Sequence, residues 1–280
     1  MPRCGAISRR AFYPLLASFA TGVLARPAQI RIGLQLYSIR GQCEQDLPAA
    51  LRDVASAGYA GVEFAGYYGH GAAELTSLLA KSRLRCCGAH VSISELLGNR
   101  LTATIDFHQV LGNRTLIVPG LPESFVSSRA AWLKTAELFS NLSARLNTEG
   151  IKLGYHNHAA EFQTLEDERP WDTFFRHVPP TVVMELDVGN AGMAGADPMA
   201  EIQRYPGRAK SLHLKDFTPG RADLLIGEGD VDWIRLLRTA HTYGGTKWFI
   251  IEHETRPSTY LSEISVSLRR LRSFSAAALR

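Results

Sequence analysis

The sequence predicts an α/β fold of the (β/α)8 TIM barrel type, built as a single domain. Eight short apolar segments alternate with eight longer amphipathic segments from residue 32 onward, and such an alternation fills the roughly 250 residues of a barrel. The chain has 280 residues, of which 45% are hydrophobic, and this is enough for one large core. An open doubly wound sheet is the main alternative. It usually has a glycine-rich phosphate turn after its first strand, whereas YSIRGQ follows Leu36 here.

The expected strands are short, mostly continuous in hydrophobicity and bounded by turn residues, as is typical of strands buried on both faces. In chain order they span residues 32–37, 61–65, 85–91, 115–120, 151–157, 181–187, 209–215 and 248–253. The expected helices span residues 46–58, 72–82, 101–112, 127–150, 170–178, 197–205, 232–245 and 258–274. In the first helix Leu47, Leu51 and Val54 keep helical spacing, Asp46 is the expected N-cap and Gly58 the expected stop.

The N-terminus differs from the rest of the chain. Arg9 and Arg10 precede an apolar run over residues 11–25 that contains no acidic residue, and SRRAF resembles a twin-arginine export signal. We therefore expect residues 1–25 to be a signal peptide, residues 26–280 to be the barrel, and the protein to be periplasmic or secreted. The run is too short for a comfortable membrane span, so no stable membrane anchor is expected. The alternative is an ordinary N-terminal extension.

The charge of the chain excludes one class of partner. The formal net charge is +4, and removal of residues 1–25 takes three arginines with it and leaves +1. No basic stripe with interleaved aromatic residues is present, so nucleic-acid binding through phosphate neutralisation is not expected.

Function in such a barrel collects at the carboxyl ends of the strands. Polar and ionisable residues stand at most of the expected strand ends, and such residues are rarely buried unless they are paired or ligating. They are Glu63, His90, His156, Asn157, His158, Glu161, Glu185, Asp187, His213, Lys215 and Glu252. By contrast, His70, His108, His177 and His241 fall in expected helices or loops and are expected at the surface.

Four of these side chains form the expected metal site, namely Glu161, Asp187, His213 and Glu252. Three carboxylates with one imidazole suit one divalent cation, Mn²⁺ first, with Mg²⁺, Co²⁺ and Zn²⁺ as alternatives. Such a cation would leave positions for two oxygens of an α-hydroxy-carbonyl compound and would stabilise an enediolate. Glu161 and Glu252 would then act as the acid and base on opposite sides of a sugar, with His90 or Lys215 holding its hydroxyl groups.

Structural interpretations of the same residues stay open. Asp187, His213 and Glu252 could form a buried salt-bridge network, and Glu161 could lie in the loop after the fifth strand. Glu185 shares its side of the sixth strand with Asp187, so it is either a partner of the ligands or part of a polar layer inside the barrel.

The segments GYHNHAAEF, MELDVGNAGMAGADP, SLHLKD, GEGDVDW and FIIEHE, in this order and spacing, resemble the sugar phosphate isomerase/epimerase group with a xylose-isomerase-like barrel. The group also includes ketose 3-epimerases, inosose dehydratases and endonuclease IV. The resemblance implies a divalent metal held by Glu, Asp, His and Glu, here Glu161, Asp187, His213 and Glu252. Glu161 follows Asn157 by four residues where related epimerases have three, so His158 is an alternative ligand or substrate contact. Asn190 occupies the place of a substrate-contacting histidine.

The expected function is therefore a metal-dependent sugar isomerase or epimerase that acts on a non-phosphorylated sugar or keto-sugar, since no phosphate loop or late arginine cluster is visible. A β-elimination lyase of 3-keto-glycosides is the first alternative, and an exported, non-catalytic sugar-binding barrel is the second. An endonuclease is disfavoured because it would need more histidines and a basic face. The expected partner is a small sugar, and a homo-oligomer is compatible with the sequence.

Overall fold

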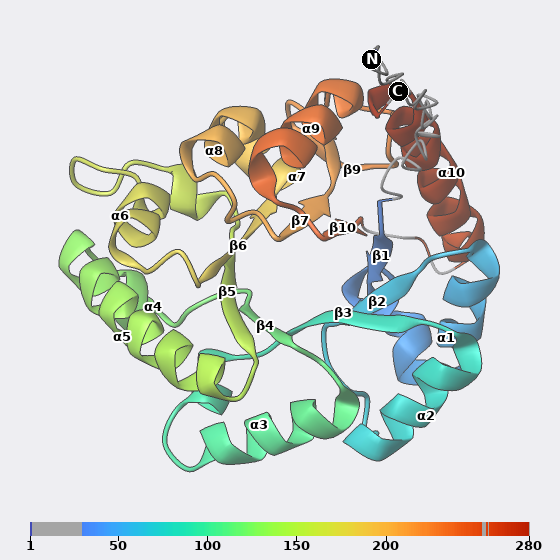
Figure 1. Ribbon diagram of the computed structural model, residues 1–280, viewed down its shortest axis with the longest axis horizontal. Coiled ribbons are helices and arrows are strands. Elements are labelled where there is room, and N and C mark those ends of the chain that lie inside the picture. Colours follow the sequence, from blue (N-terminus) through green and yellow to red (C-terminus); the bar gives the residue numbers. More distant parts are fainter. Residues whose placement is uncertain (2–29, 254–255, 257, 280) are drawn as a thin grey trace.

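The computed structural model describes Met1, residues 30–253, Arg256 and residues 258–279. Apart from Met1, the expected signal peptide lies outside the described residues. Eight parallel strands close into a barrel in which β1 pairs with both β2 and β10 (Figure 1). They are β1 (Ile32–Gln35), β2 (Gly61–Phe64), β3 (Arg85–His90), β4 (Thr115–Val118), β5 (Lys152–His156), β6 (Val183–Asp187), β7 (Ser211–Leu214) and β10 (Trp248–Ile251). The predicted fold and its eight strands are confirmed.

Helices surround the barrel in the order expected (Figure 1). They are α1 (Arg40–Ala57), α2 (Ala72–Ser82), α3 (Arg100–Leu111), α4 (Glu123–Val126), α5 (Arg129–Thr148), α6 (Pro170–His177), α7 (Val188–Met193), α8 (Pro198–Arg204), α9 (Trp233–Thr239) and α10 (Tyr260–Ala278). Short α4 and α7 were not expected. Within the part of the chain that is described, no helix is both long and apolar enough to cross a membrane.

The first helix begins earlier than its sequence signals indicated. It starts at Arg40 and breaks at Asp46, whose backbone is not helical. The Asp46 carboxylate accepts a hydrogen bond from the Ala49 N–H at 2.8 Å, so Asp46 does cap the part of the helix that contains Pro48. Gly58 ends the helix with a φ of 100°, a conformation that favours glycine.

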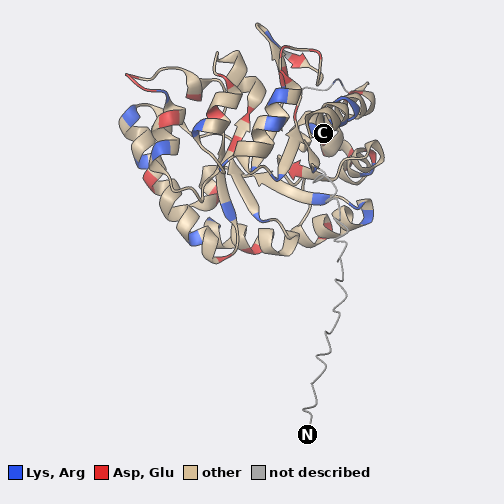
Figure 2. Ribbon diagram, turned by 45° about the horizontal axis from the view of Figure 1, so that its top comes forward, with Lys and Arg blue, Asp and Glu red and all other residues tan. Residues whose placement is uncertain are grey.

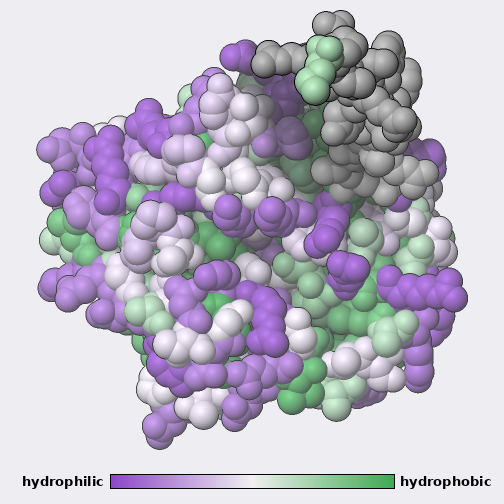
Figure 3. Space-filling model, viewed as in Figure 1, coloured by the Kyte–Doolittle hydropathy of each residue, from purple (hydrophilic) through white to green (hydrophobic). Residues whose placement is uncertain are grey.

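The apolar core lies mainly between the strands and the surrounding helices. On the outer side of β5, Tyr155 packs against Trp132, Phe139 and Phe174 from α5 and α6. The outward faces of these helices carry hydrophilic side chains along most of the left-hand edge in Figure 3, as expected for helices with one buried face. The space inside the barrel at the carboxyl ends of the strands is thereby left to polar side chains.

A bulge between β2 and β3 sets the direction of two polar side chains. The pairing register shifts between Val62 and Glu63, so Cys86 pairs with Val62 while Gly88 pairs with Glu63. A bulge of this kind changes the direction of the side chains that follow it, and here these include His90.

The loop after β7 carries a hairpin that was not expected, formed by β8 (Asp216–Thr218) and β9 (Arg221–Leu224). Buried Asp216 accepts hydrogen bonds from the Gly227 and Glu228 N–H groups and from Trp233 Nε1. The segment GEGDVDW is therefore tied to the end of β7, and Asp232 caps α9 through the Arg235 N–H.

Candidate metal centre

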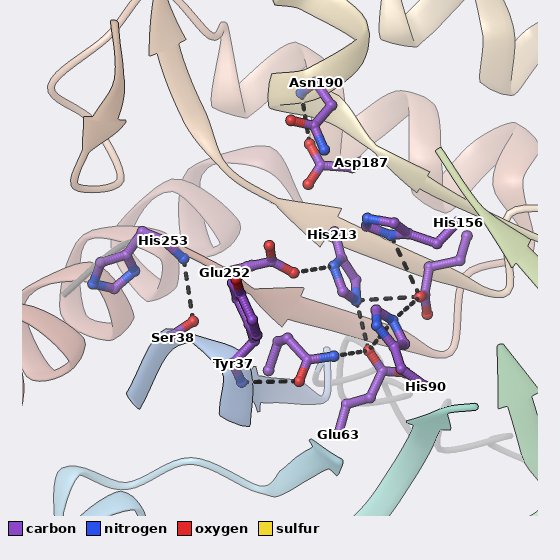
Figure 4. Close-up of polar contacts among 12 residues, drawn as sticks. Tyr37, Ser38, Glu63, His90, His156, Asp187, Asn190, His213, Glu252 and His253 are labelled. Atoms are coloured by element: carbon purple, nitrogen blue, oxygen red, sulfur yellow. Dashed lines mark hydrogen bonds and ion pairs between the residues drawn. The ribbon is translucent and has the colours of Figure 1, made fainter. Parts of the chain in front are cut away.

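Four side chains from consecutive positions around the barrel meet at the carboxyl ends of the strands. His156 ends β5, Asp187 ends β6, His213 lies in β7 and Glu252 follows β10. One nitrogen or oxygen from each of these four residues lies within 4.8 Å of the others. The side chains of His156, Asp187 and His213 are buried, and Glu252 is 12% exposed. Figure 4 shows the Asp187 carboxylate facing the space between Glu252, His213 and His156.

Asp187 is held in place through its backbone and one oxygen. The side-chain amide of Asn157 donates to the Asp187 carbonyl at 3.2 Å, and the Asn157 amide oxygen accepts from the Asp187 N–H at 2.8 Å. Asp187 Oδ1 accepts from the Asn190 N–H at 2.7 Å and so caps α7. Asp187 Oδ2 is buried and has no hydrogen-bond partner, which leaves it free to bind a cation.

His213 connects this group to a deeper layer of polar side chains. Its Nδ1 lies 2.8 Å from Glu252 Oε2, and its Nε2 lies 2.6 Å from Glu63 Oε2 and 3.3 Å from Glu185 Oε2. His90 Nε2 lies 2.9 Å from Glu185 Oε2 and 3.2 Å from Glu63 Oε2. The deeper layer therefore alternates carboxylates with imidazoles (Figure 4).

Burial and neighbouring charges change the titration of the four residues. Burial and the Glu252 charge raise the pKa of Asp187 to about 6, and burial with the nearby His213 charge lowers the pKa of His156 to about 3. Burial opposes the charged forms of Glu252 and His213, but nearby opposite charges outweigh burial in both cases. For Glu252 the main opposite charge is His213. For His213 the opposite charges are those of Glu185, Glu63 and Glu252. The pKa of Glu252 is therefore held well below its usual range and that of His213 well above.

The arrangement fits a bound divalent cation. Asp187 Oδ2 and His156 Nδ1 are buried without a hydrogen-bond partner, and such atoms are costly unless a ligand satisfies them. Two carboxylates with two imidazoles form a mixed donor set suited to Mn²⁺, Co²⁺ or Zn²⁺. A cation there would also offset the negative charges of Asp187 and Glu252.

Of the expected metal ligands, the structure brings together Asp187, His213 and Glu252 but not Glu161. Glu161 lies in the short 3-10 helix Ala160–Phe162 after β5. Its carboxylate accepts hydrogen bonds from the Tyr155 hydroxyl at 2.7 Å and from the His158 N–H at 2.8 Å. Glu161 is therefore hydrogen-bonded to a residue of the outer side of β5, and the fourth member of the group is His156.

The residues expected to contact the substrate differ in their exposure and in their contacts with the centre. His158 is exposed, with its ring 5.2 Å from that of His156, and Lys215 is close enough to lower the pKa of both Asp187 and Glu252. His90 lies in the deeper layer, 11% exposed. The side-chain amide of Asn190 donates to the Asn157 carbonyl at 3.2 Å, so Asn190 is engaged with the backbone.

The sequence placed His156, Asn157, Glu63 and Glu185 at strand ends, but none of them was expected to be a metal ligand, and Glu185 was expected as a partner of the ligands or as part of a polar layer. Alternation along β5 is a signal that could have found His156, because it lies on the same side of the strand as Gly154 and opposite Tyr155. Similarly, Asn157 stands one residue beyond His156, where its amide can reach the end of β6. His108 was expected at the surface, and that prediction is wrong, because it is 1% exposed.

Comparison with known sequences matches residues 51–273 to the family described as "Xylose isomerase-like TIM barrel". Among curated proteins, the inosose dehydratase of Clostridium tetani is 23% identical over 171 residues, which are 54% of this chain and 56% of that protein. The match therefore spans little more than half the length of this relative.

Solved structures show the same fold. A sugar phosphate isomerase/epimerase from Parabacteroides distasonis aligns with a TM-score of 0.76 at 23% identity, over 95% of this chain and all of that chain. An L-ribulose 3-epimerase aligns with a TM-score of 0.66 at 14% identity, over 89% of this chain and 96% of that chain. At these identities the likeness concerns the barrel alone.

Proposed function

Because the chain belongs to the xylose isomerase-like TIM barrel family, we propose that it is a metal-dependent enzyme that transfers protons next to a carbonyl group of a non-phosphorylated sugar or keto-sugar. The observation that carries this proposal is the convergence of His156, Asp187, His213 and Glu252 at the carboxyl ends of the strands. Polar side chains gathered there are typical of the active sites of TIM barrels.

The four residues would hold one divalent cation, for which Mn²⁺ is the first choice. When bound, the cation would polarise a substrate carbonyl and make the neighbouring carbon more acidic. Lys215 and His158 lie beside the centre and supply hydrogen-bond donors for the hydroxyl groups of a sugar.

Glu252 is the proposed base. Its contact with His213 holds the pKa of the Glu252 carboxyl well below the usual range, so the carboxylate is ionised at neutral pH and able to accept a proton. His158, exposed beside His156, is the proposed proton donor on the other side. Glu161 is not the acid or the base in this proposal, because its carboxylate already accepts hydrogen bonds from the Tyr155 hydroxyl and the His158 N–H.

Two outcomes of the same proton abstraction are compatible with this site. Return of the proton to the same carbon from the opposite face gives an epimerase. Return of the proton to the former carbonyl carbon, with a hydroxyl proton passing from one oxygen to the other, gives an isomerase, and loss of a β-substituent gives a lyase. The likeness to an inosose dehydratase supports the lyase as a second candidate, because dehydration is an elimination.

The test uses NMR to measure how fast the metal-loaded protein exchanges the α-proton of keto-sugars with deuterated water. We expect Glu252→Gln to reduce exchange by about 10²–10⁴-fold, as is usual for loss of a general base. Glu161→Gln is the matched control and should retain most of the exchange. Equal exchange rates in the wild type and the Glu252→Gln variant would remove Glu252 from the base role, and formation of an unsaturated product would favour the lyase.

A further inference from the structure

We propose that Glu63 is a positioning residue for the metal centre: its carboxylate holds the Nε2–H of His213 and thereby directs His213 Nδ1 at the bound cation. This inference rests on the proposed function only in that it takes the cation to bind at His156, Asp187, His213 and Glu252. It concerns a side chain that lies outside those four ligands and belongs to a different part of the barrel.

The two nitrogens of His213 face opposite partners. Nδ1 lies on the side of Glu252, 2.8 Å from its carboxylate, and Nε2 lies 2.6 Å from Glu63 Oε2. A neutral imidazole carries one N–H, and the nitrogen without it is the one that can bind a metal. Both nitrogens of His213 thus face a carboxylate, but only Glu252 belongs to the proposed ligands. With a cation bound between Glu252 and His213, Nδ1 would give up its proton to bind the metal, whereas Nε2 still donates to Glu63, because a carboxylate only accepts hydrogen bonds. Carboxylates that orient a metal-binding histidine in this way raise its basicity and fix its ring.

The barrel holds Glu63 in this place by several independent contacts. Its side chain is completely buried, and Glu63 Oε2 also accepts a hydrogen bond from Gln35 Nε2 at 2.9 Å. Its Oε1 lies against Gly88, where a Cβ atom would overlap it. The bulge between β2 and β3 places Gly88 opposite Glu63, so a glycine and a bulge together leave room for this carboxylate.

Glu185 supports the same ring from the neighbouring side. Its Oε2 lies 3.3 Å from His213 Nε2, and its Oε1 accepts from the Ser211 hydroxyl at 2.6 Å. His90 Nε2 lies between the two carboxylates, 3.2 Å from Glu63 and 2.9 Å from Glu185. His90 Nε2 thus contacts both acids and limits the movement of Glu63. Figure 4 shows this layer lying beneath His213, on the side away from Asp187.

The experiment compares metal affinity in Glu63→Gln with that of the wild type, without substrate, by titration of Mn²⁺ and Zn²⁺ against a competing chelator. We expect an affinity 10–100-fold lower, the usual cost of losing such a partner. The matched control is Glu201→Gln, a buried acid (2% exposed) paired with Arg169 outside the barrel, which should leave the affinity within about twofold. If Glu63→Gln does not fold, Ser211→Ala offers a milder disturbance and should lower the affinity by a smaller factor.

A second readout reports the tautomer itself. Long-range ¹H–¹⁵N spectra of histidine rings in the Zn²⁺-loaded wild type should show His213 with a metal-bound Nδ1 and a protonated Nε2, and this signature should weaken or change in Glu63→Gln. A purely structural role of Glu63 would lower thermal stability but leave affinity and tautomer unchanged, and that result would overturn the proposal.

Two further outcomes test the positioning role of Glu63 and separate it from the proposed reaction. Two cations per chain in the wild type, falling to one in Glu63→Gln, would make Glu63 a metal ligand and overturn the positioning role. If instead the wild type binds one cation with the expected dependence on Glu63 but exchanges no α-proton, this inference stands and the proposed reaction fails.

Discussion

His108 is a buried histidine that has no part in the metal centre. It lies in α3, where its Nδ1 faces the Asn113 amide at 3.1 Å and its Nε2 faces the Tyr67 hydroxyl at 3.0 Å. Since the amide nitrogen can only donate, Nδ1 accepts and the proton lies on Nε2. Burial lowers the pKa of His108 from 6.5 to about 4, because charging the ring there costs solvation free energy.

This shift predicts a loss of stability in weak acid. Between pH 6.5 and about 4 the unfolded chain binds a proton at His108 that the folded chain does not, so the free energy of unfolding falls as the pH falls through this window. The full effect is about 3 kcal/mol, at 1.4 kcal/mol for each pH unit. Urea unfolding at pH 4.5 and 7 should show a smaller pH dependence for His108→Gln than for the wild type. His177→Gln, at the exposed end of α6, should keep the wild-type dependence, and equal slopes in all three proteins would contradict the prediction.

The candidate site shows which residues a sequence can place and which it cannot. Asp187, His213 and Glu252 were predictable because each stands at the end of a buried strand, and neighbouring strand ends meet in a barrel. Glu161 lies four residues beyond Asn157, and its direction depends on a short turn and on the Tyr155 hydroxyl. No local pattern records such a contact, and the same holds for Glu63, whose place depends on pairing with β3.

At the scale of elements, strands were predicted more completely than the segments between them. The eight barrel strands are buried on both faces, so their apolar runs stand out in the sequence. The hairpin of β8 and β9 carries exposed charged residues, such as Arg221 and Asp223, and has no such run. Its position depends on Asp216 and on contacts made eleven or more residues later, which is why the sequence did not indicate it.

We expect Asp216→Ala to lower the free energy of unfolding by roughly 3 kcal/mol, because it leaves two backbone N–H groups and the Trp233 indole N–H without their acceptor. Chemical denaturation measures this effect, and hydrogen exchange should show faster exchange at Gly227 and Glu228. Asp223→Ala removes only an exposed ion pair with Arg221 and should cost less than about 1 kcal/mol. Similar losses in the two variants would contradict the anchoring role of Asp216.

At the scale of the whole molecule, positively and negatively charged residues are interspersed along the helices rather than gathered by sign (Figure 2). This distribution offers no support for binding to nucleic acid, which would favour a continuous basic surface. A small, uncharged sugar needs no such surface, and the proposed substrate class is compatible with this pattern.

We also propose that residues 1–25 direct export and that the protein acts in the periplasm or outside the cell; Arg9, Arg10 and the apolar run after them support this proposal. Expression in a bacterium with a twin-arginine pathway should yield exported protein whose N-terminus, read by mass spectrometry, is Arg26. Replacing both Arg9 and Arg10 by lysine should retain the full-length chain in the cytoplasm. Export that is unchanged in this variant would exclude the twin-arginine route.

The pairing of β1 with β10 joins the two ends of the barrel and sets an order of events during synthesis. Until β10 has been made, β1 and β7 present open edges, which are prone to pair with other chains. Glu252 follows β10 directly, so the last of the four candidate metal ligands is made only when the ring can close. A nascent or truncated chain that ends before Glu252 therefore lacks one of the four candidate ligands. Tight metal binding would then distinguish chains that contain β10, and can close the barrel, from chains that do not.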